Sequence, residues 1–231
     1  MILHWTSDLE SVPIVPLDGA VVLVLCLDDP NIVPFTRLLP GPLDLLRAEI
    51  YAGADKAYFL ARRSVLRHLI GKWLGCQPET VMIAPDSEGA PLIMAPDVKS
   101  FISVTARGAL AGFALASCRV GIDLEPPGAP QPPAWNILHP AERERLLPLD
   151  AASKHEAFLQ CWTLKEAYLK ALGVGLRREP SQIETLIADP GKCGLVDHDT
   201  QLSLDTCECR RLNIQGRKMA VACVVMPDRI I

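Results

Sequence analysis

Short, strongly hydrophobic segments of the chain have the length and composition of β-strands. Val21–Leu25 is a continuous apolar run that is typical of a buried strand. Phe101–Thr105 and Leu110–Ala116 flank the dipeptide Arg107-Gly108, and this arrangement predicts a β-hairpin. Val120–Leu124 is predicted to form another strand. Further strands are expected at Val81–Ile83, at about Thr206–Ile214 and at about Lys218–Val225.

Two longer segments have the periodicity of amphipathic helices. Asp55–Leu74 is predicted to begin with Asp55 as its cap and to end before Gly75. A second helix is expected over about Ser153–Leu172, with Ser153 as N-cap and Gly173 as its end. Together with the strands, these helices predict an α+β fold.

The two long helices also resemble each other weakly. Phe59-Leu60 in the first is echoed by Phe158-Leu159 in the second, and predicted strands follow each helix. Either two amphipathic helices are alike by chance, or the fold consists of two similar α+β halves joined near residue 119.

Composition and charge narrow the classes of function. Of the 231 residues, 49% are hydrophobic and 22% are charged, which is typical of a globular protein. The net charge of −4 and the lack of a basic run argue against a nucleic-acid-binding protein. The longest apolar stretch, Ala20–Leu27, is far shorter than the roughly 20 residues of a membrane-spanning helix. Because Met1–Glu10 lacks the features of a secretory signal, we expect a cytoplasmic protein whose eight scattered cysteines are reduced thiols.

The first candidate functional residues are two carboxylates at the end of the strand predicted near residue 120. Asp123 and Glu125 are two residues apart, so on a strand both carboxylates point to the same face and can share one cation. Hard oxygen ligands with further positions left for water and phosphate suit Mg²⁺. Taken alone, a pair of this kind is a weak signal, and solvated carboxylates at a strand edge are the usual interpretation.

The second long helix adds a more specific pattern. Trp162, Glu166 and Lys170 are four residues apart and form one stripe on a helix. Alone, Glu166 and Lys170 would be a surface ion pair. Combined with the two carboxylates of the strand, they could bind a magnesium–diphosphate, in which the metal bridges phosphate oxygens and a lysine neutralises the leaving group.

These two segments resemble the two signature motifs of the 4′-phosphopantetheinyl transferases. The motifs are Val120-Gly121-Ile122-Asp123-Leu124-Glu125 and Trp162-Thr163-Leu164-Lys165-Glu166-Ala167, followed by Lys170 and Gly173-Val174-Gly175. Length and order resemble the long, Sfp-like subclass, a monomer of two pseudo-symmetric halves with the active site at their interface. Weaker likeness extends over nearly the whole chain, through Asp55–Arg67, Leu138–Glu142 and Lys218–Ala222.

The resemblance implies transfer of the 4′-phosphopantetheine arm of coenzyme A to a serine of an acyl or peptidyl carrier protein, with Mg²⁺ and release of 3′,5′-ADP. It implies a first half, 1–118, that contacts coenzyme A, and a second half, 119–231, that holds the metal and catalytic motifs and the closing strands. Asp123, Glu125 and Glu166 would bind the metal, and Glu166 would be the general base with Glu142 nearby. Lys170 and Lys165 would steady the diphosphate, and further coenzyme A contacts are expected from Thr105, Arg107, Lys56 and Arg63.

The sequence departs from the family pattern at three positions. Ala106 stands where the family usually has a histidine, and Ala90 stands where it commonly has a lysine. Tyr58 stands where many relatives have an arginine, for which Lys56, Arg62 or Arg63 could substitute. All three changes fall on coenzyme A binding, whereas every metal-side residue is present.

Two other functions stay open at this point. One is a non-catalytic relative that docks a carrier protein or a partner enzyme, which Ala90 and Ala106 favour. The other is a magnesium-dependent phosphoryl-transfer enzyme unrelated to carrier proteins, against which the full helix motif argues. The carrier protein, its fatty acid, polyketide or nonribosomal peptide pathway, and the preference for coenzyme A or acyl-coenzyme A are not determined by the sequence.

Overall fold

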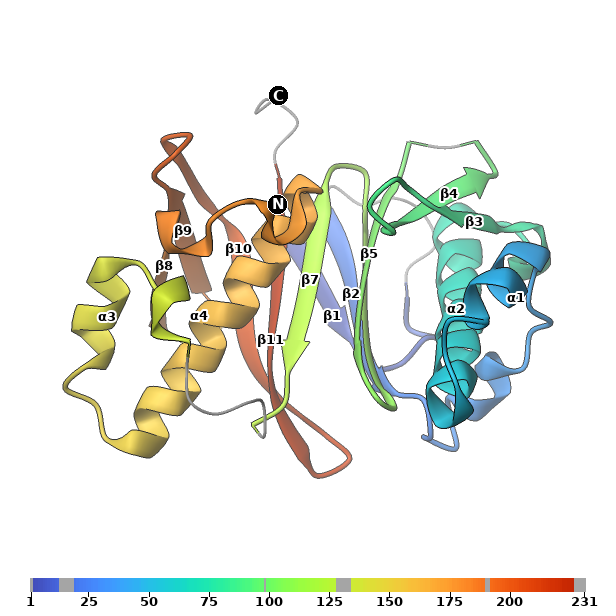
Figure 1. Cartoon of the computed structure of the whole chain (residues 1–231). Coiled ribbons are helices and arrows are strands. Elements are labelled where there is room, and N and C mark those ends of the chain that lie inside the picture. Colours follow the sequence, from blue (N-terminus) through green and yellow to red (C-terminus); the bar gives the residue numbers. More distant parts are fainter. Residues whose placement is uncertain (1, 13–18, 98, 128–133, 190–191, 227–231) are drawn as a thin grey trace. The chain divides into compact units, whose positions relative to one another are not determined.

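Two units make up the chain, Met1–Cys118 and Arg119–Ile231, and each has its own hydrophobic core. The computed structural model describes residues 2–12, 19–97, 99–127, 134–189 and 192–226 (Figure 1). In each unit a 22-residue helix packs against a β-sheet. This confirms the predicted α+β class. The functions assigned to the two parts and the interfacial active site stay predictions.

The sheet of the first unit has four strands in the order β1-β2-β6-β5. β1 and β2 pair in parallel, and the other neighbours pair antiparallel. The predicted hairpin around Arg107-Gly108 is present as β5–β6. A separate two-stranded ribbon is formed by β3 and β4. The strands are β1 (Ile2–Thr6), β2 (Gly19–Cys26), β3 (Met82–Pro85), β4 (Pro91–Ala95), β5 (Phe101–Arg107) and β6 (Leu110–Ala116).

The long helix of the first unit, α2 (Gly53–Leu74), packs its apolar face onto this sheet. It begins two residues earlier than predicted, because the extended backbone of Ala52 is its N-cap and Asp55 lies in its first turn. Its predicted end is confirmed, since Gly75 takes the left-handed conformation with φ +67° and closes the last turn. A shorter helix, α1 (Pro42–Ala48), precedes α2.

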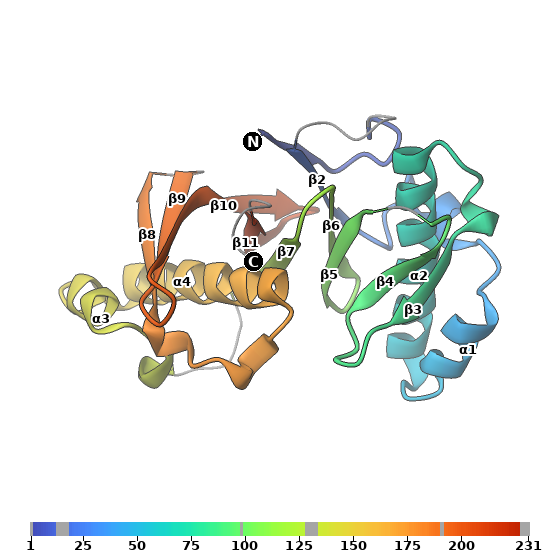
Figure 2. The same cartoon turned by 90° about the horizontal axis from the view of Figure 1, so that it is seen from above.

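The sheet of the second unit has five antiparallel strands in the order β7-β11-β10-β9-β8. Seen from above, α4 (Ala151–Leu172) lies across one face of this sheet (Figure 2). The predicted pseudo-symmetry of the halves stays a prediction, because the two sheets differ in strand number and in pairing. The strands are β7 (Val120–Glu125), β8 (Ile183–Asp189), β9 (Lys192–Asp197), β10 (Leu202–Ile214) and β11 (Arg217–Val225), and a short helix, α3 (Pro140–Leu146), precedes α4.

The helix α4 is capped at both ends by local chemistry. Asp150, and not the predicted Ser153, is the N-cap, and its side chain accepts hydrogen bonds from the N–H groups of Ala152 and Ser153 at 2.9 and 3.1 Å. Gly173 ends the helix in the left-handed conformation with φ +73°, as predicted.

A glycine fixes how closely α4 approaches the edge strand β7. A Cβ atom at Gly121 would lie 1.9 Å from the carbonyl oxygen of Ala167 and 2.6 Å from the nitrogen of Ala171. A side chain there would clash with the helix backbone, so Gly121 is needed for this packing. Asp123 and Glu125 follow on the same face of the strand, and the close approach therefore places them beside α4.

The state of the cysteines is consistent with the prediction that they are reduced thiols. All eight are free, and all except the half-buried Cys76 are buried. Within the described residues, no helix combines the length and the hydrophobicity that crossing a bilayer requires.

Candidate functional site

The end of β7 carries two buried carboxylates. Asp123 is 1% exposed and Glu125 is 4% exposed, and alternation along the strand directs both to the face on which α4 packs. This confirms the predicted strand position of both residues. Carboxylates are seldom buried unless cations or hydrogen-bond donors compensate their charge.

The cation that meets Asp123 comes from α4. Lys170 Nζ lies 2.6 Å from Asp123 Oδ1 and also donates to the carbonyl oxygen of Ile122 at 3.3 Å. The lysine side chain is 30% exposed, so its ammonium group remains accessible from solvent while it contacts the buried aspartate. The strand and helix motifs are therefore joined through a direct ion pair.

The third carboxylate of the predicted set, Glu166, is partly exposed and precedes Lys170 by one helical turn. β7 and α4 run side by side in opposite directions (Figure 1). Strand positions after Gly121 therefore advance toward earlier turns of the helix, which is the direction in which Glu166 lies. Asp123, Glu125 and Glu166 are hard oxygen donors of the type that Mg²⁺ prefers, on adjoining elements. Among the described residues, their oxygens do not form a cluster of three within 4.8 Å of one another, so the structure brings them to neighbouring positions and not into one coordination sphere.

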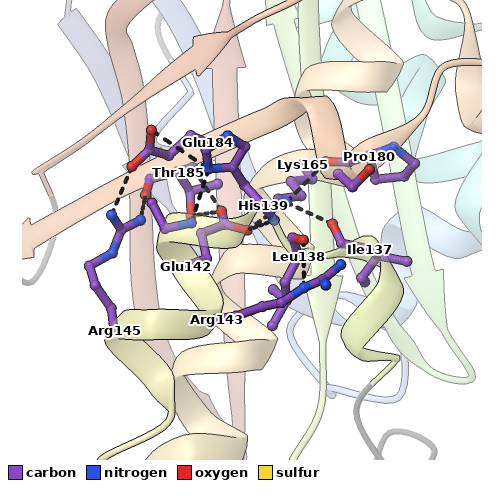
Figure 3. A network of polar contacts seen from close by, with 12 residues as sticks. Ile137, Leu138, His139, Glu142, Arg143, Arg145, Lys165, Pro180, Glu184 and Thr185 are labelled. Atoms are coloured by element: carbon purple, nitrogen blue, oxygen red, sulfur yellow. Dashed lines mark hydrogen bonds and ion pairs between the residues drawn. The ribbon is translucent and has the colours of Figure 1, made fainter.

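The other two residues predicted to act in the second unit, Glu142 and Lys165, bind each other in the interior (Figure 3). Both side chains are 0% exposed, and Lys165 Nζ lies 2.6 Å from Glu142 Oε2. Lys165 also donates to the carbonyl oxygens of Ile137 and Pro180 at 2.8 and 3.0 Å. Burial lowers the pKa of Lys165, and the Glu142 carboxylate opposes the shift.

Both carboxylate oxygens of Glu142 also accept hydrogen bonds from other groups. Its Oε2 accepts from the backbone N–H of His139 at 2.8 Å, and its Oε1 accepts from both the N–H and the hydroxyl of Thr185 at 2.8 and 2.6 Å. An ammonium group has three donors, and all three of Lys165 are used. In this arrangement Lys165 offers no N–H to a phosphate, so its catalytic role and that of Glu142 stay predictions that would require the network to open.

A basic cavity of about 260 Å³ lies in the first unit. Of the four coenzyme A contacts predicted in this unit, Arg63 and Thr105 line the cavity. Lys56 instead pairs with Glu49 at the surface, 2.7 Å away, and Arg107 is exposed at the end of β5. The lining residues are Arg47, Tyr51, Phe59, Arg62, Arg63, Leu66, Pro85, Gly89, Pro91, Val104, Thr105 and Ala106.

The positive charge of Arg63 is largely compensated within the protein. Its Nε donates to Asp44 Oδ1 at 2.5 Å, and its Nη2 donates to the carbonyl oxygen of Ile83 at 2.8 Å. Asp44, which is 1% exposed, also pairs with Arg67. Arg63 therefore holds α2 to α1 and β3, and the cavity wall contains two further arginines, Arg47 and Arg62.

Two arginines of the cavity wall were not among the coenzyme A contacts that we predicted from the sequence, apart from Arg62 as a possible substitute at position 58. Arg62 lies over the ring of Phe59, with its guanidinium carbon 5.9 Å from the ring centroid. Arg47 of α1 donates from Nη2 to the carbonyl oxygen of Gly89 at 2.8 Å. This contact places a guanidinium beside Ala90, where the family pattern would have a lysine. Arg47 was missed because α1 was not predicted, although Pro42 in the first turn of this helix was a signal for it.

Comparisons with known proteins agree with the motifs. The sequence model described as the 4′-phosphopantetheinyl transferase superfamily matches residues 119–223. The chain is 32% identical over 157 residues to the 4′-phosphopantetheinyl transferase HetI of Nostoc sp., a match that covers 64% of the chain and 66% of the relative. It is 29% identical over 166 residues to slr0495 of Synechocystis sp., provisionally named a 4′-phosphopantetheinyl transferase, with 69% of the chain and 67% of the relative covered. The matched segments thus span about two thirds of each relative.

Proposed function

The chain belongs to the 4′-phosphopantetheinyl transferase superfamily, and from this premise we propose that it transfers the 4′-phosphopantetheine arm of coenzyme A to a serine of an acyl or peptidyl carrier protein. The observation that carries the proposal is the ion pair between Asp123 and Lys170. This contact sets a carboxylate of the strand motif beside the ammonium of the helix motif, and a carboxylate with a nearby ammonium is the chemistry that a metal-bound diphosphate requires.

In the proposed reaction the serine hydroxyl oxygen attacks the β-phosphorus of coenzyme A. A new P–O bond forms to the serine, the bond from this phosphorus to the bridging oxygen breaks, and 3′,5′-ADP leaves with the bridging oxygen. Glu166 is assigned to accept the hydroxyl proton, because this residue is partly exposed and lies one helical turn before Lys170. Lys170 is placed to stabilise the negative charge that develops on the leaving phosphate.

We assign the metal to Asp123, Glu125 and Glu166. A bound Mg²⁺ would polarise the diphosphate and neutralise part of its charge. Lys170 would orient Asp123, since its ammonium contacts Oδ1 directly. The buried Glu142–Lys165 pair would support the site from a distance by holding α3 to α4.

The cavity of the first unit is proposed to take the nucleotide end of coenzyme A. Arg47 and Arg62 supply positive charge for phosphate groups, and Tyr51 and Phe59, whose ring centroids are 5.0 Å apart, supply an aromatic wall. Arg47 would restore the charge that Ala90 lacks. A monomeric, cytoplasmic protein remains part of this proposal.

One observation favours the alternative of a non-catalytic relative. Ala106 lines the cavity and adds no hydrogen-bond donor where the family pattern has a histidine. Such a protein would bind coenzyme A or a carrier protein without transferring the arm. The two functions differ in their dependence on the carboxylates, because only catalysis requires Glu166 as a base.

The test compares carboxylate variants in a transfer assay with coenzyme A radiolabelled in its pantetheine part. Asp123→Asn and Glu166→Gln should each lower the rate of labelling of an apo carrier protein by at least about 100-fold, while circular dichroism stays unchanged. Glu156→Gln is the matched control, because Glu156 is on α4 but pairs with Arg211 at the exposed surface. Labelling by Asp123→Asn and Glu166→Gln at the wild-type rate would refute the assignment.

A further inference from the structure

A second group of metal-ligating side chains lies in the Arg119–Ile231 unit, apart from the three carboxylates. His139 is the N-cap of α3, Glu184 lies on β8, and His198 follows the last residue of β9. Each of these residues offers one ligand atom, and the three atoms lie within 4.8 Å of one another. Three separate elements of the fold therefore bring two imidazoles and one carboxylate together.

The distances from the two imidazoles to the carboxylate resemble those between neighbouring ligands of a bound metal. His198 Nε2 is 3.4 Å from Glu184 Oε2, and His139 Nδ1 is 3.8 Å from the same oxygen. With metal–ligand bonds of roughly 2.0–2.1 Å, a tetrahedral zinc ion holds neighbouring ligand atoms about 3.3 Å apart. The two distances to Glu184 Oε2 are close to this value, so each imidazole nitrogen already lies near the carboxylate oxygen as two ligands of one metal would.

A neighbouring arginine orients the carboxylate of this group (Figure 3). Arg145 Nη1 donates to Glu184 Oε1 at 2.8 Å, and its Nη2 donates to the carbonyl oxygen of Thr185 at 2.7 Å. Because the arginine occupies Oε1, the other oxygen of Glu184 is the one that faces the imidazoles. In zinc proteins, residues that do not touch the metal hold its ligands in place by hydrogen bonds, and Arg145 holds Glu184 in this way.

Backbone contacts hold the two histidines at these positions. The N–H of His139 donates to Glu142 Oε2 at 2.8 Å, and the N–H of His198 donates to the carbonyl oxygen of Gln182 at 2.9 Å. Their rings are stacked, with centroids 4.5 Å apart and planes at 3°. A metal would tilt the rings until both nitrogens converge on it, and it would replace the long hydrogen bond, 3.3 Å, that Nδ1 of His139 accepts from Ala141.

We propose that His139, Glu184 and His198 bind a zinc ion or another divalent transition metal, with water in the remaining position. Two imidazole nitrogens and one carboxylate form a donor set that favours zinc over magnesium, which prefers oxygen ligands. The side chains of His139, Glu184 and His198 are 19%, 16% and 38% exposed, so an ion can reach them from solvent. The bound metal would tie the start of α3 to β8 and to the turn after β9, and this site is independent of the proposed transfer reaction.

The experiment measures zinc binding to the full chain by calorimetry, after removal of metals with EDTA and dialysis into buffer with excess Mg²⁺. The wild type should bind one zinc ion, and binding should be at least about tenfold weaker in His139→Asn, Glu184→Gln and His198→Gln. Asparagine is chosen at position 139 because it preserves the N-cap of α3. The melting temperature of the wild type should rise with zinc, and that of the three variants should not.

Two controls separate this site from others. His4→Gln changes a half-buried histidine outside the group, and Asp123→Asn removes a ligand of the proposed magnesium site; both should bind zinc like the wild type. The proposal is overturned if the wild type binds no stoichiometric zinc, or if the three variants retain its affinity. It is equally overturned if Asp123→Asn abolishes binding, since zinc would then occupy the carboxylates of β7 and α4.

Discussion

Two lysines of the helix motif, five residues apart in sequence, have opposite environments. Lys170 is partly exposed and contacts Asp123, whereas Lys165 is fully buried with Glu142. The sequence predicted that both would meet phosphate, because spacing on a helix shows which residues share a face but not which face a neighbouring element covers. The partner of Lys165 is 23 residues away in sequence, on a helix whose packing the sequence did not determine.

The Glu142–Lys165 pair predicts a measurable non-additivity in stability. Glu142→Gln or Lys165→Met alone should lower the free energy of unfolding by about 3–5 kcal/mol, because each leaves a buried charge without its partner. The double variant should lose clearly less than the sum of the two single losses, since it contains neither charge. Urea denaturation of the four proteins measures this cycle, and simple additivity of the losses would contradict a coupled pair.

At the scale of elements, the site depends on how α4 is begun, ended and packed. Gly173 was predicted as its end because a glycine in the left-handed conformation is a common terminator. The N-cap was predicted three residues late, because Ser153 and Asp150 are both good capping residues and only the backbone geometry distinguishes them. The close approach at Gly121 was not predicted, since it depends on the position of the helix backbone above the strand.

The cap of α4 predicts a pH dependence. The hydrogen bond from the Ser153 hydroxyl, followed by that from the Ser153 N–H, lowers the pKa of Asp150 below its ordinary value of 3.8. Because the pKa of Asp150 is lower in the folded state than in the unfolded state, its ionised carboxylate stabilises the fold at pH values above the unfolded-state pKa. This stability is lost as the pH falls through the folded-state pKa. Asp150→Ala should therefore lower the urea midpoint at pH 7, and its difference from the wild type should shrink below about pH 4.

Asp150→Asn is the matched control, because asparagine caps helices without titrating. Its urea midpoint at pH 7 should stay close to that of the wild type. If the deficit of Asp150→Ala were the same at pH 3 as at pH 7, the charged carboxylate would not be the stabilising cap.

At the scale of the whole molecule, the sequence predicted the class of fold and the main strands and helices but not the elements that depend on tertiary pairing. β9 contains Lys192, Gly194 and Asp197, which have low strand propensity, and it is held by pairing with β8 and β10. α1, and with it Arg47, was missed for a different reason: its start was assigned to a proline-rich loop, although Pro42 stands at its first turn and its residues are good helix formers. The carboxylates of the candidate site were predictable because their spacing along one strand and one helix is local information.

The central claim is the transfer reaction, and the most direct test is the intact mass of an apo carrier protein incubated with this protein, coenzyme A and Mg²⁺. The account predicts a gain of about 340 Da, the mass of a covalently attached phosphopantetheine arm. The gain should disappear with EDTA and return when Mg²⁺ is added in excess. An unchanged mass across acyl and peptidyl carrier proteins, with coenzyme A and Mg²⁺ at saturating concentrations, would contradict the transferase and favour a non-catalytic relative.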